Sequence, residues 1–352
     1  MRRLVPVTIA LLLSATVLLR GAVGDDLILL RFGDYLDALR GQAGIPGLAA
    51  TIVRTGENNW ERVYGRQDIE RSIFTRPDTP FQIDGLTQLI TASIVLGCAE
   101  EGRLSIDEPM GRLAKHSPEP GATIRQILTH TSITPEGLVY SYRPERLNSL
   151  VETVAACRGM SFRAAVATLL DRFVMADSLP GMDSLDIIPP ADHLTVEDLQ
   201  RYTDIFDRLA KPYAVEKGGA TQSQYLATGL TPASGLISTV RDLARFDAAL
   251  RRGVILLPET LAEAWTPPLD RNENRLPHGL GWFVQNYNGE RIVWQFGVTD
   301  NASSSMIITV PSRGMTLILF ANSSGLSRPF LLSAGDIMVS PFARLFLSIF
   351  VR

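Results

Sequence analysis

The spacing of hydrophobic residues at the start of the chain predicts a helix followed by a β-hairpin. Leucine and aromatic side chains recur at helical spacings over residues 26–42. After a Pro-Gly turn, the apolar run Leu48–Val53 predicts a buried strand, and Trp60–Tyr64 predicts its return strand. The turn between them falls on residues 55–59, which are rich in Gly and Asn.

Helical periodicity dominates the middle of the chain, from residue 86 to about residue 209. A Pro/Gly-rich connection over residues 180–190 interrupts it. The clearest helical patterns are Leu86–Glu101, Thr123–Leu128, Leu147–Ala156 and Phe162–Phe173.

The last third of the chain returns to strands. A helix is predicted at Val240–Leu250, and a final helix at Leu332–Phe350. Four strands are predicted between them, at Gly281–Tyr287, Arg291–Phe296, Ser304–Val310 and Thr316–Ala321. This order indicates an α+β fold, in which the first and last helices flank one antiparallel sheet. The sheet lobe covers about 25–84 and 228–352, and a mostly helical lobe covers about 85–227.

The first 24 residues have the pattern of a signal peptide. A positive start, Arg2-Arg3, precedes the uncharged stretch Leu4–Leu19 and the small-x-small sequence Ala22-Val23-Gly24. Sixteen helical residues span roughly 24 Å, less than the ~30 Å of a bilayer core. We therefore expect cleavage after residue 24 and export of residues 25–352 to the periplasm or the medium. The alternative is an uncleaved N-terminal membrane anchor.

Composition narrows the range of partners. The net charge of −3 gives no basic surface for nucleic acid. The four histidines are scattered and there is no Cys/His cluster, so we predict no metal site and no cofactor. Cys98 and Cys157 lie in apolar helical patterns, which favours buried free thiols, although export would permit a disulfide.

Several short strings, in order, resemble the β-lactamase-related serine hydrolases. This family includes class C β-lactamases, penicillin-binding DD-peptidases and related esterases. The resemblance implies a β-lactamase/transpeptidase-like fold and covers roughly residues 30–335. The strings are Ile45–Leu48, Tyr64-Gly65, Asp78–Ile83, Thr123–Ser132, Ser234–Thr239 with Asp242–Phe246, and Gly279–Trp282.

The family's first catalytic motif is S-x-x-K at a helix N-terminus. The serine attacks a carbonyl, and the lysine one turn along takes its proton. The flanking residues place the serine position on Gly85 and the lysine position on Gln88. Glycine has no nucleophile, and a glutamine amide does not accept a proton near neutral pH. No Ser-x-x-Lys occurs anywhere in the sequence.

The other two family motifs are also degenerate. Tyr140-Ser141-Tyr142 is the best match to Y-x-N, so the phenol survives at Tyr140 while Tyr142 replaces the asparagine. Tyr140 is equally compatible with an ordinary buried tyrosine. The K-T-G or H-x-G motif falls on Gln295-Phe296-Gly297, where glutamine replaces the basic residue. Gly297 is also explained by close packing in a strand.

Asp84 is the strongest substitute for the lost groups. It would act as a base, or as an N-cap of the following helix, which is the commoner role of Asp at such a position. Thr87 is predicted to point into the core, and His130 to hold a helix end. Ser141 has no evident base besides Tyr140. None of these residues assembles a nucleophile, a base and an oxyanion hole.

Three functions remain open. The first, which we favour, is a non-catalytic binding or regulatory protein for a peptidoglycan-like peptide, a β-lactam, a small ester or a protein partner. The second is a hydrolase with a rearranged site. The third is an envelope scaffold without a ligand. An open cleft near Gly85 and Gln295 would favour the first, and a convergent acid/base pair the second. A cleft filled by Phe296, Tyr142 and Leu86 would favour the third.

Overall fold

The computed structural model describes residues 26–55, 59–217, 219–226 and 229–351. The predicted signal peptide, residues 1–24, lies outside the described residues. No helix in these ranges is long and apolar enough to cross a membrane.

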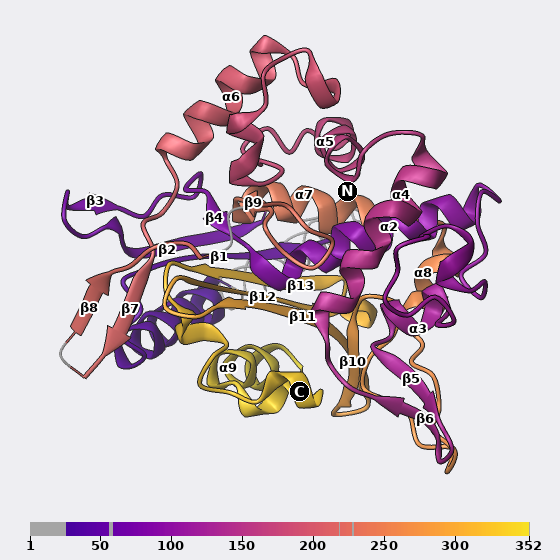
Figure 1. Cartoon of the computed structure of the whole chain (residues 1–352). Helices are drawn as coiled ribbons and strands as arrows, with labels where there is room; N and C mark the ends of the chain where they lie inside the picture. Colours follow the sequence, from indigo (N-terminus) through magenta and orange to yellow (C-terminus); the bar gives the residue numbers. More distant parts are fainter. Residues whose placement is uncertain (1–25, 56–58, 218, 227–228, 352) are drawn as a thin grey trace, which may run out of the picture.

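A seven-stranded antiparallel sheet forms the centre of the molecule (Figure 1). Its order is β10-β11-β12-β13-β1-β2-β3, so the N-terminal hairpin pairs with the last strand in the sequence. The strands are β1 (Gly47–Arg54), β2 (Trp60–Asp68), β3 (Ile73–Phe74), β10 (Phe283–Tyr287), β11 (Glu290–Thr299), β12 (Ser303–Val310) and β13 (Met315–Ala321). Each predicted strand is present, with ends shifted by a few residues.

One face of the sheet is covered by the first and last helices, as the sequence predicts. The helix over residues 26–42 packs against α9 (Pro341–Phe350), with the rings of Phe32 and Phe346 6.3 Å apart. Both rings are fully buried against sheet residues such as Leu319. The α+β arrangement therefore follows from two amphipathic helices that bury their apolar faces on one sheet.

On the opposite side of the sheet lie helices from the middle of the chain (Figure 1), of which α7 contacts β1 and β13 directly. The central one is α2, which is buried along nearly its whole length and therefore has no polar face. The helices are α2 (Thr87–Glu100), α3 (Ile124–Leu128), α4 (Leu150–Arg158), α5 (Phe162–Arg172), α6 (Val196–Asp207), α7 (Val240–Arg251) and α8 (Pro258–Ala264).

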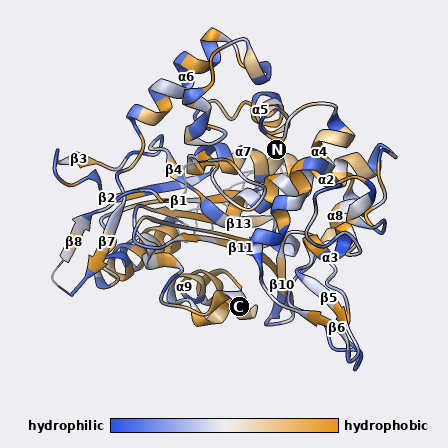
Figure 2. Ribbon diagram, viewed as in Figure 1, coloured by the Kyte–Doolittle hydropathy of each residue, from blue (hydrophilic) through white to orange (hydrophobic). Residues whose placement is uncertain are grey.

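Three short strand pairs interrupt the helical part and were not predicted. They are β4 (Phe81–Gln82) with β9 (Ile237–Ser238), β5 (Thr131–Thr134) with β6 (Gly137–Tyr140), and β7 (Tyr213–Glu216) with β8 (Gly219–Gln222). The β5–β6 hairpin projects from the body (Figure 1), and the ribbon of β6 has the colour of hydrophobic residues in Figure 2. Ile133 and Val139 of this hairpin are exposed.

The predicted final helix from Leu332 is wrong in its first part. Two single 3₁₀ turns occupy Leu332–Ala334 and Ile337–Val339, and the α-helix begins only at Pro341. Ser340 is the N-cap, because its hydroxyl accepts a bond from the Ala343 N–H. Proline at the first helical position fixes this start.

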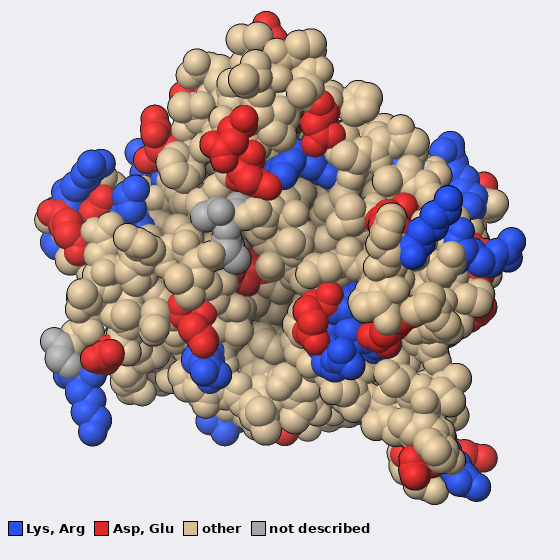
Figure 3. Space-filling model, viewed as in Figure 1, with Lys and Arg blue, Asp and Glu red and all other residues tan. Residues whose placement is uncertain are grey.

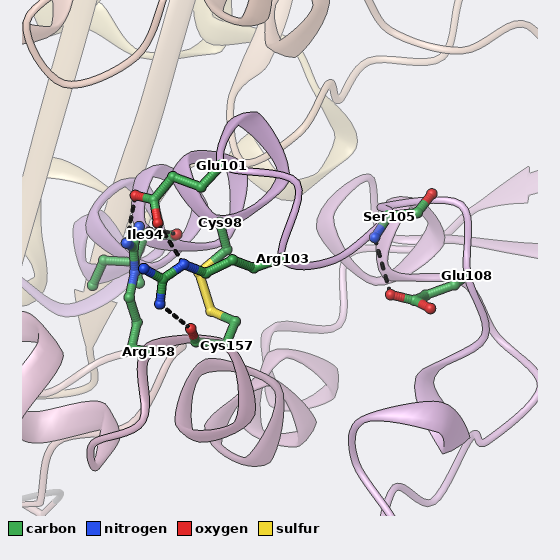
Figure 4. Close-up of a disulfide and its surroundings, with 8 residues drawn as sticks. All are labelled: Ile94, Cys98, Glu101, Arg103, Ser105, Glu108, Cys157 and Arg158. Atoms are coloured by element: carbon green, nitrogen blue, oxygen red, sulfur yellow. Dashed lines mark hydrogen bonds and ion pairs between the residues drawn. A yellow bond between two sulfur atoms is a disulfide. The ribbon is translucent and has the colours of Figure 1, made fainter.

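The predicted free thiols are also wrong: Cys98 and Cys157 form a disulfide (Figure 4). It links α2 to α4, and both cysteines are buried. Beside the disulfide, the Arg103 guanidinium donates a hydrogen bond to the Cys157 carbonyl oxygen at 3.0 Å. Periodicity placed each cysteine correctly on an apolar helix face, but it carries no information on which faces meet.

Candidate functional site

The three positions at which the sequence analysis expects the family motifs lie together where the chain enters α2. A 3₁₀ turn, η1 (Asp84–Leu86), leads into α2 and lies against β11 and β12 of the sheet. The face in Figure 3 is hollowed near its centre, in the region where α2 begins in Figure 1, and charged side chains surround the hollow.

Gly85 lies in close contact with the backbone of β11. A Cβ atom at this position would lie 2.4 Å from the Phe296 carbonyl oxygen and 3.3 Å from the Gly297 Cα. A carbon and a carbonyl oxygen normally approach no closer than about 3.3 Å. No side chain, serine included, therefore fits at Gly85 unless η1 and β11 separate.

Gly297 is required for the same contact from the other side. Its Cβ would lie 2.4 Å from the Ile83 carbonyl oxygen and 2.7 Å from the Gly85 nitrogen. Close packing, one of the two interpretations offered for Gly297, therefore holds. The two glycines together let η1 rest directly on the strand.

Gln88, at the lysine position, is fixed by a buried hydrogen-bond chain. Its Nε2 donates to the Tyr142 hydroxyl at 2.8 Å, and its Oε1 lies 3.1 Å from His130 Nε2. His130 Nδ1 accepts from the Arg143 N–H at 3.2 Å, which assigns the proton to Nε2 and makes that nitrogen the donor to Gln88. Burial lowers the pKa of His130 well below its usual value, so the chain is neutral.

Gln295, at the second basic position, is also buried and bonded. Its Nε2 donates to the Gly281 carbonyl at 3.2 Å and lies 3.5 Å from His278 Nε2, while its Oε1 accepts from the Phe296 N–H at 2.9 Å. Burial lowers the pKa of His278 to about 3. The rings of His278 and His130 meet edge to face at 4.7 Å. Both former basic positions thus contact neutral histidines.

Tyr142, rather than Tyr140, faces the site. The Tyr140 hydroxyl donates to the Ser333 carbonyl at 2.8 Å, which ties β6 to the C-terminal turns. Tyr142 bonds to Gln88 and its ring lies 5.4 Å from that of Phe296. The structural interpretation of Tyr140 therefore holds, and the phenol beside the lysine position comes from the place where the motif expects asparagine.

The predicted N-cap role of Asp84 is wrong. Neither η1 nor α2 has a side-chain cap, and Asp84 has a left-handed φ of 50°. Its carboxylate accepts bonds from Thr299 Oγ1 at 2.5 Å and Ser303 Oγ at 2.8 Å. Burial raises the pKa of this carboxyl to about 6, while the two hydroxyl bonds oppose the shift. Asp84 thus joins the start of η1 to the end of β11 and the start of β12.

The remaining substitutes behave largely as predicted. Thr87 is buried and its hydroxyl accepts from the Leu236 N–H at 3.2 Å, whereas Ser141 is exposed. His130 was expected only to hold a helix end, yet it also bonds to Gln88. The sequence analysis missed Thr299 and Ser303, because nothing in their spacing connects them to a residue more than 200 positions earlier.

Comparisons with known proteins identify the family. A family model described as Beta-lactamase matches residues 32–168 and 187–334. Among curated proteins, "Protein flp" of Staphylococcus aureus (strain MW2) is 22% identical over 329 residues, which are 79% of this chain and 60% of that protein. The chain thus spans about 60% of the length of this relative.

Solved structures share the fold at low identity. A D-amino acid amidase from Ochrobactrum anthropi SV3, complexed with L-phenylalanine amide, has a TM-score of 0.69 at 18% identity, covering 92% of this chain and 98% of the other. A class C β-lactamase from Rhodobacter sphaeroides has a TM-score of 0.67 at 17% identity, covering 92% and 99%. Because this family model matches most of its length, the chain belongs to the Beta-lactamase family.

Proposed function

We propose that this chain is a non-catalytic member of the Beta-lactamase family, whose former active site has become a packed structural junction. One observation carries the proposal. The serine position is a glycine pressed against β11, with the Phe296 carbonyl oxygen 2.4 Å from where a Cβ would be. A nucleophile there is therefore absent and also sterically excluded.

The lost basic groups support the same conclusion. Gln88 and Gln295 each have both amide atoms bonded, and the histidines that they contact have lowered pKa values. No proton acceptor is thus available at either family position near neutral pH. Since polar groups in such a network are fully satisfied, it stabilises one packed arrangement.

The same arrangement argues against the family cleft as the binding site. Leu86 is fully buried, and Phe296 is 7% exposed with the Tyr142 ring beside it. Close packing of these three side chains, beside the surface hollow in Figure 3, fits a scaffold better than a receptor for β-lactams, peptides or small esters. A role in the cell envelope through other surfaces fits these contacts best.

Export is part of the proposal. The Cys98–Cys157 disulfide favours an oxidising compartment, because cytosolic thiols are kept reduced. Together with the predicted signal peptide, it supports a periplasmic or secreted location for residues 25–352.

A rearranged hydrolase is the second candidate, because of one specific contact. The Thr299 hydroxyl bonds to the Asp84 carboxylate, whose pKa of about 6 suits a general base. Against it, Asp84 is 1% exposed and its other oxygen is bonded to Ser303. A nucleophile at Thr299 would need an oxyanion site that no motif supplies.

Turnover assays separate the two candidates. The purified mature protein is offered fluorogenic penicillins, cephalosporins and short-chain esters, beside a Gly85→Ser/Gln88→Lys double variant and a Thr299→Val variant. The proposal expects no turnover by the wild type or by the double variant, because restoring the residues does not open the junction. Wild-type turnover that Thr299→Val abolishes would overturn it in favour of the rearranged hydrolase.

A further inference from the structure

A cavity of about 700 Å³ lies apart from the Gly85 junction and shares no lining residue with it. Its apolar wall consists of small residues on α7 and larger side chains from the ends of α5 and α8. The backbone at the end of β1 and the turn before β13 complete it. The apolar lining residues are Val53, Phe173, Val174, Ala244, Ala248, Ala249, Leu261, Trp265 and Pro311.

The polar lining of this cavity is one-sided in charge. Among the described residues, the lining contains no aspartate or glutamate. It contains four arginines, namely Arg54, Arg245, Arg251 and Arg252. Two of these arginines form ion pairs with carboxylates outside the lining: Arg245 with Asp242, and Arg251 with Asp247. Without counting Arg54, the lining carries three guanidinium groups, and two carboxylates are paired with them. The cavity therefore has an excess of positive charge.

Arg251 is held in place before any ligand arrives. Its Nε bonds to Asp247 at 2.9 Å, and its Nη1 donates to Thr55 Oγ1 at 2.9 Å and to the Gly314 carbonyl at 3.2 Å. Arg252 is exposed, and its Nε donates to the Ala248 carbonyl at 3.1 Å. An arginine fixed in this way loses little side-chain entropy when its remaining N–H groups bind an anion.

We propose that this cavity binds a small organic monocarboxylate with an apolar body. The guanidinium fork matches a carboxylate in shape and charge. The alanine, leucine and aromatic wall suits the apolar part, and the volume lies in the range of small-molecule sites. The proposal does not depend on whether the Gly85 junction is catalytic.

Displacement of a fluorescent probe tests the site in the mature protein. Anilinonaphthalene sulfonate is titrated into wild type, Arg252→Glu, a cavity-filling Ala248→Leu, and the control Arg275→Glu, which reverses an exposed arginine outside the lining. Decanoate and 1-decanol then compete for the bound probe. Thermal melts of each variant verify that the fold is intact.

The expected result is one probe site per chain, displaced by decanoate at concentrations at which 1-decanol has no effect. Arg252→Glu should weaken binding about tenfold, the factor that loss of one charge-assisted bond produces. Ala248→Leu should weaken it as well, and Arg275→Glu should leave it unchanged. Equal binding by all four proteins, or equal displacement by the alcohol, would overturn the proposal.

Discussion

Adding a methyl group at Gly85 tests the contact between η1 and β11. The new Cβ would lie 2.4 Å from the Phe296 carbonyl oxygen, about 0.9 Å closer than an ordinary carbon–oxygen contact. The obstacle is the backbone of a strand that is paired on both sides, by β10 and β12, and Phe296 pairs with Met306 of β12. Relief therefore requires a shift of η1 or of the strand, and overpacking of this kind costs about 1–3 kcal/mol.

Equilibrium unfolding in urea measures this cost as the change in free energy of unfolding of Gly85→Ala. Gly121→Ala is the matched control, because its Cβ would meet nothing within 4 Å, and it should change stability by less than about 0.5 kcal/mol. If Gly85→Ala is as stable as the control, η1 does not rest on β11 as described. The steric argument against a nucleophile at this position would then fail.

Three further perturbations have defined outcomes. Gln88→Lys should destabilise by about 1–3 kcal/mol in urea unfolding, because an ammonium cannot accept the bond from His130; exposed Gln224→Lys should not. Cys98→Ser should lower the free energy of unfolding by about 2–5 kcal/mol, because it removes the disulfide. A reducing agent should destabilise wild type but not the variant. The pKa of Asp84 is raised from 3.8 to about 6, so its contribution to stability is complete below pH 3.8 and is lost as pH rises through about 6. Relative to Asp84→Asn, wild type should lose about 3 kcal/mol between these pH values, and a pH-independent difference would contradict the burial of this carboxyl.

The sheet and its flanking helices were predictable. The first and last helices bury one apolar face that their periodicity reveals, and strands such as β1 and β13, which are buried on both faces, are short apolar runs. The start of α9 was predictable too, because Ser340-Pro341 is an N-cap followed by a proline at the first helical position. The β5–β6 hairpin was overlooked although Pro135 and Gly137 mark its turn. For the start of α9 and for this hairpin, the sequence therefore contained the signal and our prediction overlooked it.

The contacts within the site could not be predicted from local patterns. The sequence assigned Gly85 and Gln88 to the predicted motif positions, but the contact between η1 and β11 depends on how a turn meets a strand more than 200 residues later in the chain. Asp84 illustrates this limit. Its position before a helix favours an N-cap, whereas Thr299 and Ser303, which lie far along the chain, take both carboxylate oxygens. Such contacts depend on which strands and turns pack together in the fold, and hydrophobic periodicity does not specify this.

Covalent labelling shows whether a nucleophile operates in this protein, which the proposed function excludes. The purified mature protein is incubated with a fluorophosphonate and, separately, with a penicillin, and its intact mass is measured beside an active class C β-lactamase. We expect an unchanged mass for this protein and a stoichiometric adduct for the enzyme. A stoichiometric adduct on this chain would show that it is catalytic, and its mapped position would identify the nucleophile.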